Sequence, residues 1–248
     1  VSPHGRGIPK GRFVMQKTYA LFDFDGTLIR GDSILHFTRY AYRQGLIGTR
    51  EWLTLLGTGI LYGLRLRTAV AAKERVMRFL AGKREQEVAA IAESFCQAEL
   101  IPRLRPEGLA EIAAHRAQGH VVLLISASST FYLNRLRQTL GVDDVIGTRF
   151  DVTPDGVFTG RVCGDNCRGV QKPLRLAEYL AAKGDRLDYD TSSAYGDSLG
   201  DLSMLRLCAH PVAVNPKPRL WRALRAQAGV RRVRWAEPAP PPGVEGPG

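Results

Sequence analysis

Short apolar runs of the kind that form buried parallel strands recur along this chain. The first run, Tyr19–Phe24, leads into two aspartates one residue apart, Asp23 and Asp25. Further runs are Val121–Ser126, Val145–Val152, Ser192–Tyr195, Pro211–Val214 and Val230–Trp235. From Pro106 onward, segments with helical spacing alternate with these runs. Strand–helix alternation with right-handed crossovers predicts an α/β fold, a three-layer sandwich around a parallel sheet.

Residues 33–105 interrupt this alternation after a single strand, because none of their segments alternates between apolar and polar positions. We expect a helix that begins with Ser33 as its N-cap. Further helices are expected over Trp52–Leu64, Thr68–Leu80 and Glu85–Leu100. Such a region is predicted to be an all-helical cap inserted into the core, which then comprises residues 18–32 and 106–235.

Two more local patterns complete the outline. A helix is expected to begin at Ser126, directly after the second strand, and a Pro154-Asp155-Gly156 turn should pair Val157–Val162 with the strand before it. Residues 1–17 are rich in Gly and Arg without periodicity, and residues 236–248 are rich in Pro and Gly. We interpret these ends as a disordered leader and a disordered tail.

The chain of 248 residues is basic, with a formal net charge of +11. Its Lys and Arg residues are scattered, so the charge suits anionic substrates or phospholipid head groups as well as nucleic acid. Nucleic-acid binding would need basic clusters interleaved with aromatics, and the best such cluster, Arg231–Trp235, is short. We therefore expect no nucleic-acid partner. Nothing in the sequence indicates an oligomeric state.

Cysteine usage and hydropathy bear on the compartment. Four cysteines in a chain of this length are sparse and predict reduced thiols, and no secretory signal is visible at the start. A cytoplasmic location follows as the expectation. The apolar stretch Trp52–Leu64 is too short to span a bilayer. With Arg50, Arg65 and Arg67 beside it, this stretch leaves peripheral contact with a membrane surface open.

Polar residues fall where the core strands end or a core helix begins. They are Asp23 and Asp25, Ser126, Lys172, and the pair Asp197 and Asp201. Taken singly, each has an ordinary interpretation as a turn, a helix cap or a surface lysine. Ligands bind at the carboxyl edge of parallel strands, where all of these side chains should meet. Crowded carboxylates there favour a hard cation, and oxygen ligands suit Mg²⁺.

This constellation fits phosphoryl transfer. Asp23 is the candidate nucleophile, and Asp25 the candidate general acid and base. The metal is assigned to Asp23, Asp25 through its backbone carbonyl, Asp197 and Asp201. Phosphate oxygens are assigned to Gly26, Thr27, Ser126, Ala127 and Lys172, the last of which neutralises developing charge.

The motifs resemble those of the haloacid dehalogenase superfamily of phosphatases, and most closely its phosphoserine-phosphatase-like branch with a helical cap. The four motifs are Asp23-Phe24-Asp25-Gly26-Thr27-Leu28, Leu124-Ile125-Ser126-Ala127-Ser128, the run from Asn166 to Lys172, and Tyr195-Gly196-Asp197-Ser198-Leu199-Gly200-Asp201-Leu202. The resemblance implies a Rossmann-like core and a Mg²⁺-dependent hydrolase that acts through an aspartyl-phosphate. Asp25 disfavours a dehalogenase, which typically lacks that second aspartate.

The same resemblance implies less about the substrate. Phosphoserine phosphatases hold the substrate amine with a Glu near the position of Asp32 and the substrate carboxylate with a cap arginine, for which Arg75 competes with Arg65, Arg67 and Arg78. They usually carry Asn where this chain has Gly200. The Asn166-Cys167 run is similar to a subgroup with histidinol-phosphate and phosphatidylglycerophosphate phosphatases. A small phosphorylated metabolite, phosphoserine- or histidinol-phosphate-like, is the leading expectation, and a lipid phosphate at the membrane surface is the alternative.

Overall fold

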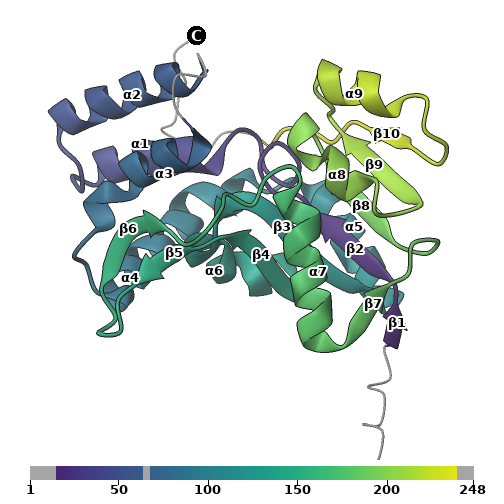
Figure 1. Cartoon of the computed structure of the whole chain (residues 1–248). Helices are drawn as coiled ribbons and strands as arrows, with labels where there is room; N and C mark the ends of the chain where they lie inside the picture. Colours follow the sequence, from purple (N-terminus) through teal and green to yellow (C-terminus); the bar gives the residue numbers. More distant parts are fainter. Residues whose placement is uncertain (1–14, 64–67, 239–248) are drawn as a thin grey trace, which may run out of the picture.

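The computed structural model describes residues 15–63 and 68–238. Its main sheet has the strand order β10-β9-β8-β2-β3-β4, and every neighbouring pair is parallel (Figure 1). The strands are β2 (Tyr19–Phe22), β3 (Val121–Ser129), β4 (Asp144–Thr148), β8 (Ser193–Gly196), β9 (His210–Val214) and β10 (Arg231–Val233). Strand β2 lies inside the sheet between β3 and β8. The polar residues that follow these three strands are therefore neighbours at one edge.

Side chains of β2 alternate between two apolar layers. Ala20 and Phe22 belong to the layer that includes residues of α5 (Pro106–Ala117) and α6 (Thr130–Leu140). Tyr19 and Leu21 belong to the opposite layer, with residues of α7 (Gln171–Lys183), α8 (Leu202–Leu205) and α9 (Pro218–Leu224). Alternation with both faces buried is what a central parallel strand requires. The predicted α/β sandwich with a parallel sheet is confirmed.

A helical insertion follows β2 and precedes α5. Its helices are α1 (Ser33–Arg43), α2 (Thr49–Gly63), α3 (Ala69–Met77) and α4 (Glu85–Phe95), the last continued by a π-helical turn over Cys96–Leu100. In Figure 1 the insertion lies toward the β4 edge of the sheet, with α2 outermost. Within the described residues, no helix has both the length and the hydropathy that crossing a bilayer requires. The expected basic flank at Arg65 and Arg67 lies outside the described residues.

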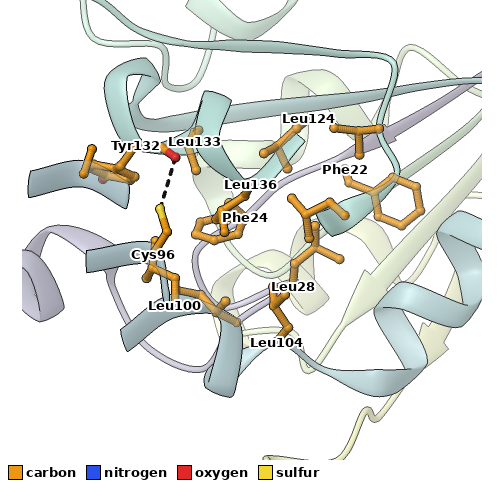
Figure 2. Packing of buried hydrophobic residues seen from close by; sticks show 14 of the residues in the cluster. Phe22, Phe24, Leu28, Cys96, Leu100, Leu104, Leu124, Tyr132, Leu133 and Leu136 are labelled. Atoms are coloured by element: carbon orange, nitrogen blue, oxygen red, sulfur yellow. Dashed lines mark hydrogen bonds between the residues drawn. The ribbon is translucent and has the colours of Figure 1, made fainter. Parts of the chain in front are cut away.

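The insertion and the core share one apolar layer. Figure 2 shows Cys96 and Leu100 of the insertion packed against Phe24, Leu28 and α6 side chains such as Leu136. The Cys96 thiol also donates to the carbonyl of Tyr132 at 3.3 Å. Burial of aromatic and aliphatic side chains across this contact stabilises the position of the insertion on the core.

A β-hairpin extends from the core to the insertion. Strands β5 (Phe150–Val152) and β6 (Phe158–Val162) pair in an antiparallel fashion, as expected from the Pro-Asp-Gly turn. The backbones of Gly82 and Lys83 bond to Phe158, at 2.9 and 2.8 Å. The single strand predicted over Val145–Val152 is wrong: β4 ends at Thr148, and the chain leaves the main sheet before the hairpin begins.

Other boundaries also differ from the sequence expectations. Met15–Lys17, assigned to the leader, form strand β1, which pairs in parallel with β7 (Asp185–Leu187). Glu237, assigned to the tail, forms an ion pair with Arg30 at 2.8 Å. The helix expected from Ser126 begins at Thr130, because β3 continues to Ser129. Residues 1–14 of the expected leader and 239–248 of the expected tail lie outside the described residues.

Candidate active site

The turn after β2 carries the first motif. The backbone N–H of Asp23 donates to the carbonyl of Tyr195 in β8 at 2.9 Å, which fixes the aspartate between two strand ends. Gly26 has a φ of 80°, and a Cβ there would lie 2.3 Å from Asp197 Oδ2. Glycine is therefore required at this position both by the left-handed backbone and by the close approach of Asp197.

Three carboxylates and one ammonium meet at the edge of the sheet. Oxygens of Asp23, Asp197 and Asp201 all lie within 4.8 Å of one another, and the three residues are buried. Lys172 Nζ lies 2.6 Å from Asp23 Oδ1 and 2.6 Å from Asp201 Oδ1, and its residue is 1% exposed. The fold thus brings together Asp23, Lys172, Asp197 and Asp201 from distant parts of the sequence.

Burial and crowding perturb the pKa values in this cluster. Burial, reinforced by the charge of Asp201, raises the pKa of Asp23 well above its ordinary value, although Lys172 opposes the rise. Burial alone would raise the pKa of Asp201, but the charge and hydrogen bond of Lys172 hold it below the ordinary value. Burial would lower the pKa of Lys172, and the carboxylates of Asp201 and Asp23 raise it instead. An all-oxygen, negatively charged donor set of this kind fits Mg²⁺.

Lys217 is a member of the site that the sequence analysis missed. Its Nζ lies 2.7 Å from Asp197 Oδ2, and its backbone N–H donates to the Asp197 carbonyl at 2.8 Å. The Lys217 side chain is 65% exposed, whereas that of Asp197 is 5% exposed. The only sequence signal was the position of Lys217 just after the strand end at Asn215-Pro216.

The Asp25 carboxylate accepts hydrogen bonds from residues outside the three-carboxylate cluster. Its Oδ1 accepts the backbone N–H of Ser33 at 2.8 Å, and its Oδ2 accepts the hydroxyl of Ser128. Burial, with a contribution from Asp32, raises the pKa of Asp25 to about 7. The cluster of carboxylates that could hold a metal ion, as found among the described residues, does not include the Asp25 side chain. The expected metal contact of Asp25 is left to its backbone carbonyl.

The expected phosphate-binding residues line the same strand ends. Ser126 is buried, and its hydroxyl accepts the backbone N–H of Ser128 at 3.2 Å. Thr27 is also buried, with its hydroxyl 3.4 Å from Asp23 Oδ2. The Ala127 carbonyl accepts the Thr148 hydroxyl at 2.6 Å. Because β3 runs on to Ser129, the backbone N–H groups near Ser126 belong to a strand end and not to the first turn of a helix.

Lys73 reaches this region from α3 and was also missed. Its ammonium donates to the carbonyl of Ala127, to Asn166 Oδ1 and, at 3.3 Å, to Thr148 Oγ1. Burial lowers the pKa of Lys73 to about 8. All three acceptors are uncharged oxygens of the core, so Lys73 ties the helical insertion to the end of β3. A lysine on an amphipathic helix is usually solvated, and the sequence alone offered no sign of this contact.

The two expected substrate residues, Asp32 and Arg75, lie at the start of α1 and on α3. Asp32, not Ser33, is the N-cap of α1, where its Oδ1 accepts the backbone N–H of Ile34 at 2.9 Å. Ser33 is buried instead, and its hydroxyl bonds to those of Ser128 and Tyr132. Arg75 lies two residues after Lys73 on α3, so its side chain leaves the helix about 200° away from that of Lys73.

Comparison with known proteins places these features in a family. The family model of haloacid dehalogenase-like hydrolases matches residues 20–206. The chain belongs to this family. A histidinol-phosphatase from Neisseria meningitidis serogroup C is 30% identical over 209 residues, 82% of this chain and 93% of its own length.

Two solved structures share the fold. A protein of unknown function from Bordetella pertussis matches 88% of this chain and 99% of its own, with a TM-score of 0.79 and 28% identity. A phosphoserine phosphatase, described as a phospho-aspartyl intermediate analogue, matches 88% of this chain and 93% of its own with a TM-score of 0.60. At 21% identity this second likeness concerns the fold alone. The expectation of a hydrolase of this superfamily is confirmed.

Proposed function

We propose that this protein is a Mg²⁺-dependent phosphatase that hydrolyses small phosphomonoesters through an aspartyl-phosphate on Asp23. The main support for this proposal is the buried group of Asp23, Asp197 and Asp201 around Lys172 at the carboxyl edge of the sheet. The name of the histidinol-phosphatase described above supports the same activity. The free state of all four cysteines supports a reducing compartment such as the cytoplasm.

The proposed reaction has two displacements. In the first, an Asp23 oxygen forms a bond to phosphorus while the ester O–P bond breaks, and Asp25 gives its proton to the leaving alcohol oxygen. In the second, water attacks phosphorus, Asp25 takes the water proton, and the Asp23–phosphorus bond breaks to release phosphate. A pKa of about 7 suits Asp25 for both directions of proton transfer near neutral pH.

The surrounding residues orient the nucleophile and bind the phosphoryl group and the metal ion. Lys172, bonded to both Asp23 and Asp201, steadies the nucleophile and offsets charge on the phosphoryl group. Phosphate oxygens are assigned to Ser126, Thr27 and backbone N–H groups at Gly26 and Ala127. Asp23, Asp197, Asp201 and the Asp25 carbonyl would hold Mg²⁺. When bound, the ion would lower the repulsion between the carboxylate nucleophile and the anionic substrate.

A lipid phosphate at a membrane surface is the second candidate. It is supported by the exposed Leu53 on α2, which is 61% exposed, beside Trp52, which stacks on Tyr42. An apolar helix face with basic neighbours can dock on anionic lipid. Sedimentation with anionic liposomes separates the candidates, because a metabolite phosphatase without membrane contact stays in the supernatant at low salt.

The direct test is phosphate release from a panel that includes histidinol phosphate, phosphoserine, phosphatidylglycerophosphate and para-nitrophenyl phosphate. The wild type should be silent in EDTA and restored by Mg²⁺, and Asp23→Asn should be inactive in both while keeping its circular dichroism spectrum. Turnover by Asp23→Asn at a tenth of the wild-type rate would exclude Asp23 as the nucleophile. Asp197→Ala should raise the Mg²⁺ concentration needed for half-maximal activity, and an unchanged titration would remove Asp197 from the metal site.

A further inference from the structure

Lys73 is a cation beside the expected phosphate site that the proposed reaction does not use. It lies on α3, is partly buried, and donates to three oxygens of the core: the Ala127 carbonyl, Asn166 Oδ1 and Thr148 Oγ1. Ala127 directly follows Ser126, whose hydroxyl is assigned to a phosphate oxygen. A positive charge from the helical insertion is therefore bonded to the backbone of the strand end that should bind phosphate.

The peptide group between Ala127 and Ser128 joins Lys73 to the Ser126 hydroxyl. Its carbonyl accepts the Lys73 ammonium, and its N–H donates to Ser126 Oγ at 3.2 Å. In a trans peptide the carbonyl and the N–H point in opposite directions, so the ammonium and the hydroxyl lie on opposite sides of one rigid plane. Because hydrogen bonds hold this plane on both sides, Lys73 helps to fix the orientation of the group that contacts Ser126.

The same hydrogen bonds polarise one another. An ammonium bonded to the carbonyl draws electron density through the conjugated amide, which makes the N–H of that amide a stronger donor. The Thr148 hydroxyl donates to the same carbonyl at 2.6 Å and acts in the same direction. A serine hydroxyl carries a single hydrogen, and Ser126 accepts at its oxygen, so that hydrogen remains for an acceptor such as a phosphate oxygen.

We propose that Lys73 is a positioning residue for the phosphoryl group and acts through the Ala127–Ser128 peptide on the Ser126 hydroxyl. No proton is transferred along this chain of hydrogen bonds. Lys73 orients and polarises the peptide, and Ser126 contacts the phosphate. This role rests on the phosphatase function proposed above and adds to it a dependence of phosphate binding on the packing of α3 against the core.

Glu74 provides a matched control on the same helix. Its Oε1 accepts the backbone N–H of Val162 in β6 at 3.0 Å, so Glu74 also holds α3 against a neighbouring element. That contact is made to the β5–β6 hairpin and not to the end of β3. If Lys73 did no more than hold the insertion in place, Glu74→Ala and Lys73→Met would have the same effect on phosphate binding.

Calorimetric titration with inorganic phosphate in the presence of Mg²⁺ measures binding without turnover. Lys73→Met and Ser126→Ala should each weaken phosphate binding about tenfold. The double variant should also lose about tenfold, instead of the roughly hundredfold expected of independent residues, because Lys73 acts through Ser126. Lys73→Arg, which keeps the charge, should retain most of the affinity, and Glu74→Ala should bind phosphate as the wild type does.

The Ser128 amide proton reports on the same contact in the absence of phosphate. Its magnetic resonance signal should move upfield in Lys73→Met, because a weaker hydrogen bond to Ser126 leaves the proton more shielded, and should stay in place in Glu74→Ala. Thermal melts confirm that each variant is folded. Lys73→Gln, which keeps a donor without the charge, takes the place of Lys73→Met if the latter unfolds, with the same expected results.

Additive losses of phosphate affinity, equal losses in Lys73→Met and Glu74→Ala, or an unshifted Ser128 signal would each overturn the role of Lys73. The phosphatase proposal would stand in all three cases, because it is decided by ester hydrolysis. If the wild type binds phosphate but hydrolyses no ester, the phosphatase proposal fails and the titrations still decide the role of Lys73. A wild type that binds no phosphate would overturn that role whatever the hydrolysis assays give.

Discussion

The two sides of the candidate site are built differently. On the core side, Asp23, Asp201 and Lys172 are joined by direct ion pairs at strand ends and are almost fully buried. On the side of the insertion, Lys73 crosses to the core, and its acceptors among the described residues are the neutral oxygens of Ala127, Thr148 and Asn166. The core side is therefore held by charges that compensate one another. The insertion side is held by hydrogen bonds that form only when α3 packs against the core.

This difference has a chemical consequence. Paired buried charges hold one another in place, and removal of one partner leaves the others uncompensated. A single ammonium among neutral oxygens is instead penalised by its burial, which lowers its pKa toward neutrality. We expect substitutions on the core side to abolish chemistry or stability, and those on the insertion side to change pH dependence and selectivity.

After the complete loss of turnover expected for Asp23→Asn, the largest expected effect is that of Asp25→Asn on turnover. The amide retains an acceptor for the Ser33 N–H but cannot move a proton, so the rate should fall on the order of 10²–10⁴-fold. Steady-state phosphate release with an alkyl ester and with para-nitrophenyl phosphate measures this. The alkyl ester should suffer more, because its leaving group needs the proton. Wild-type rates with both esters would contradict the role of Asp25.

The next effect compares two lysines of the core. Lys172→Met leaves two buried carboxylates without their cation and should lower the free energy of unfolding by about 3–5 kcal/mol. Lys217→Met removes a largely exposed partner of Asp197 and should lower it by less than about 1 kcal/mol. Urea denaturation in EDTA at neutral pH measures both. Equal losses would show that burial does not separate the two ion pairs.

Lys73 should make the free energy of unfolding depend on pH. Its folded pKa of about 8 lies below its ordinary value of 10.5, so between these values the unfolded chain holds the proton that the folded chain has lost. Wild-type stability should therefore rise over this window relative to Lys73→Met, by about 1–3 kcal/mol between about pH 7 and about pH 10. Urea denaturation at both pH values measures this. Lys183→Met, an exposed control on α7, should follow the wild type, and a parallel response of Lys73→Met would contradict the assignment.

The smallest effect concerns Asp32 and Arg75. Because Asp32 is an N-cap, Asp32→Ala should lower the free energy of unfolding by about 0.5–2 kcal/mol. Asp32→Asn should lower it almost not at all, since Asn also caps helices. A substrate contact predicts in addition that Asp32→Asn and Arg75→Ala lower kcat/KM on the best substrate by about 1–3 kcal/mol more than on para-nitrophenyl phosphate. Equal losses on both substrates would leave Asp32 as a helix cap and remove Arg75 from the substrate site.

The sequence by itself determined the sheet and the core side of the site. Apolar runs marked β2, β3, β8 and β9, and Asp23, Asp197 and Asp201 stood directly at or after strand ends. Parallel strands bring their carboxyl ends to one edge of the sheet, so these residues were expected at that edge. The position of β2 between β3 and β8 makes them neighbours. Lys172 could be found in the same way because it lies in the first turn of a core helix, α7.

Only the tertiary structure decided the contacts that cross between elements. Asp25 bonds to Ser33 and Ser128, and Lys73 meets Asn166, through packing that no local pattern records. The break after β4 was hidden because Val145–Val152 is apolar enough for one strand. In the structure the chain instead continues into a hairpin that bonds to the insertion. Local sequence fixes which face of an element is apolar, whereas the docking of α3 on the core depends on the summed burial of side chains distant in the chain.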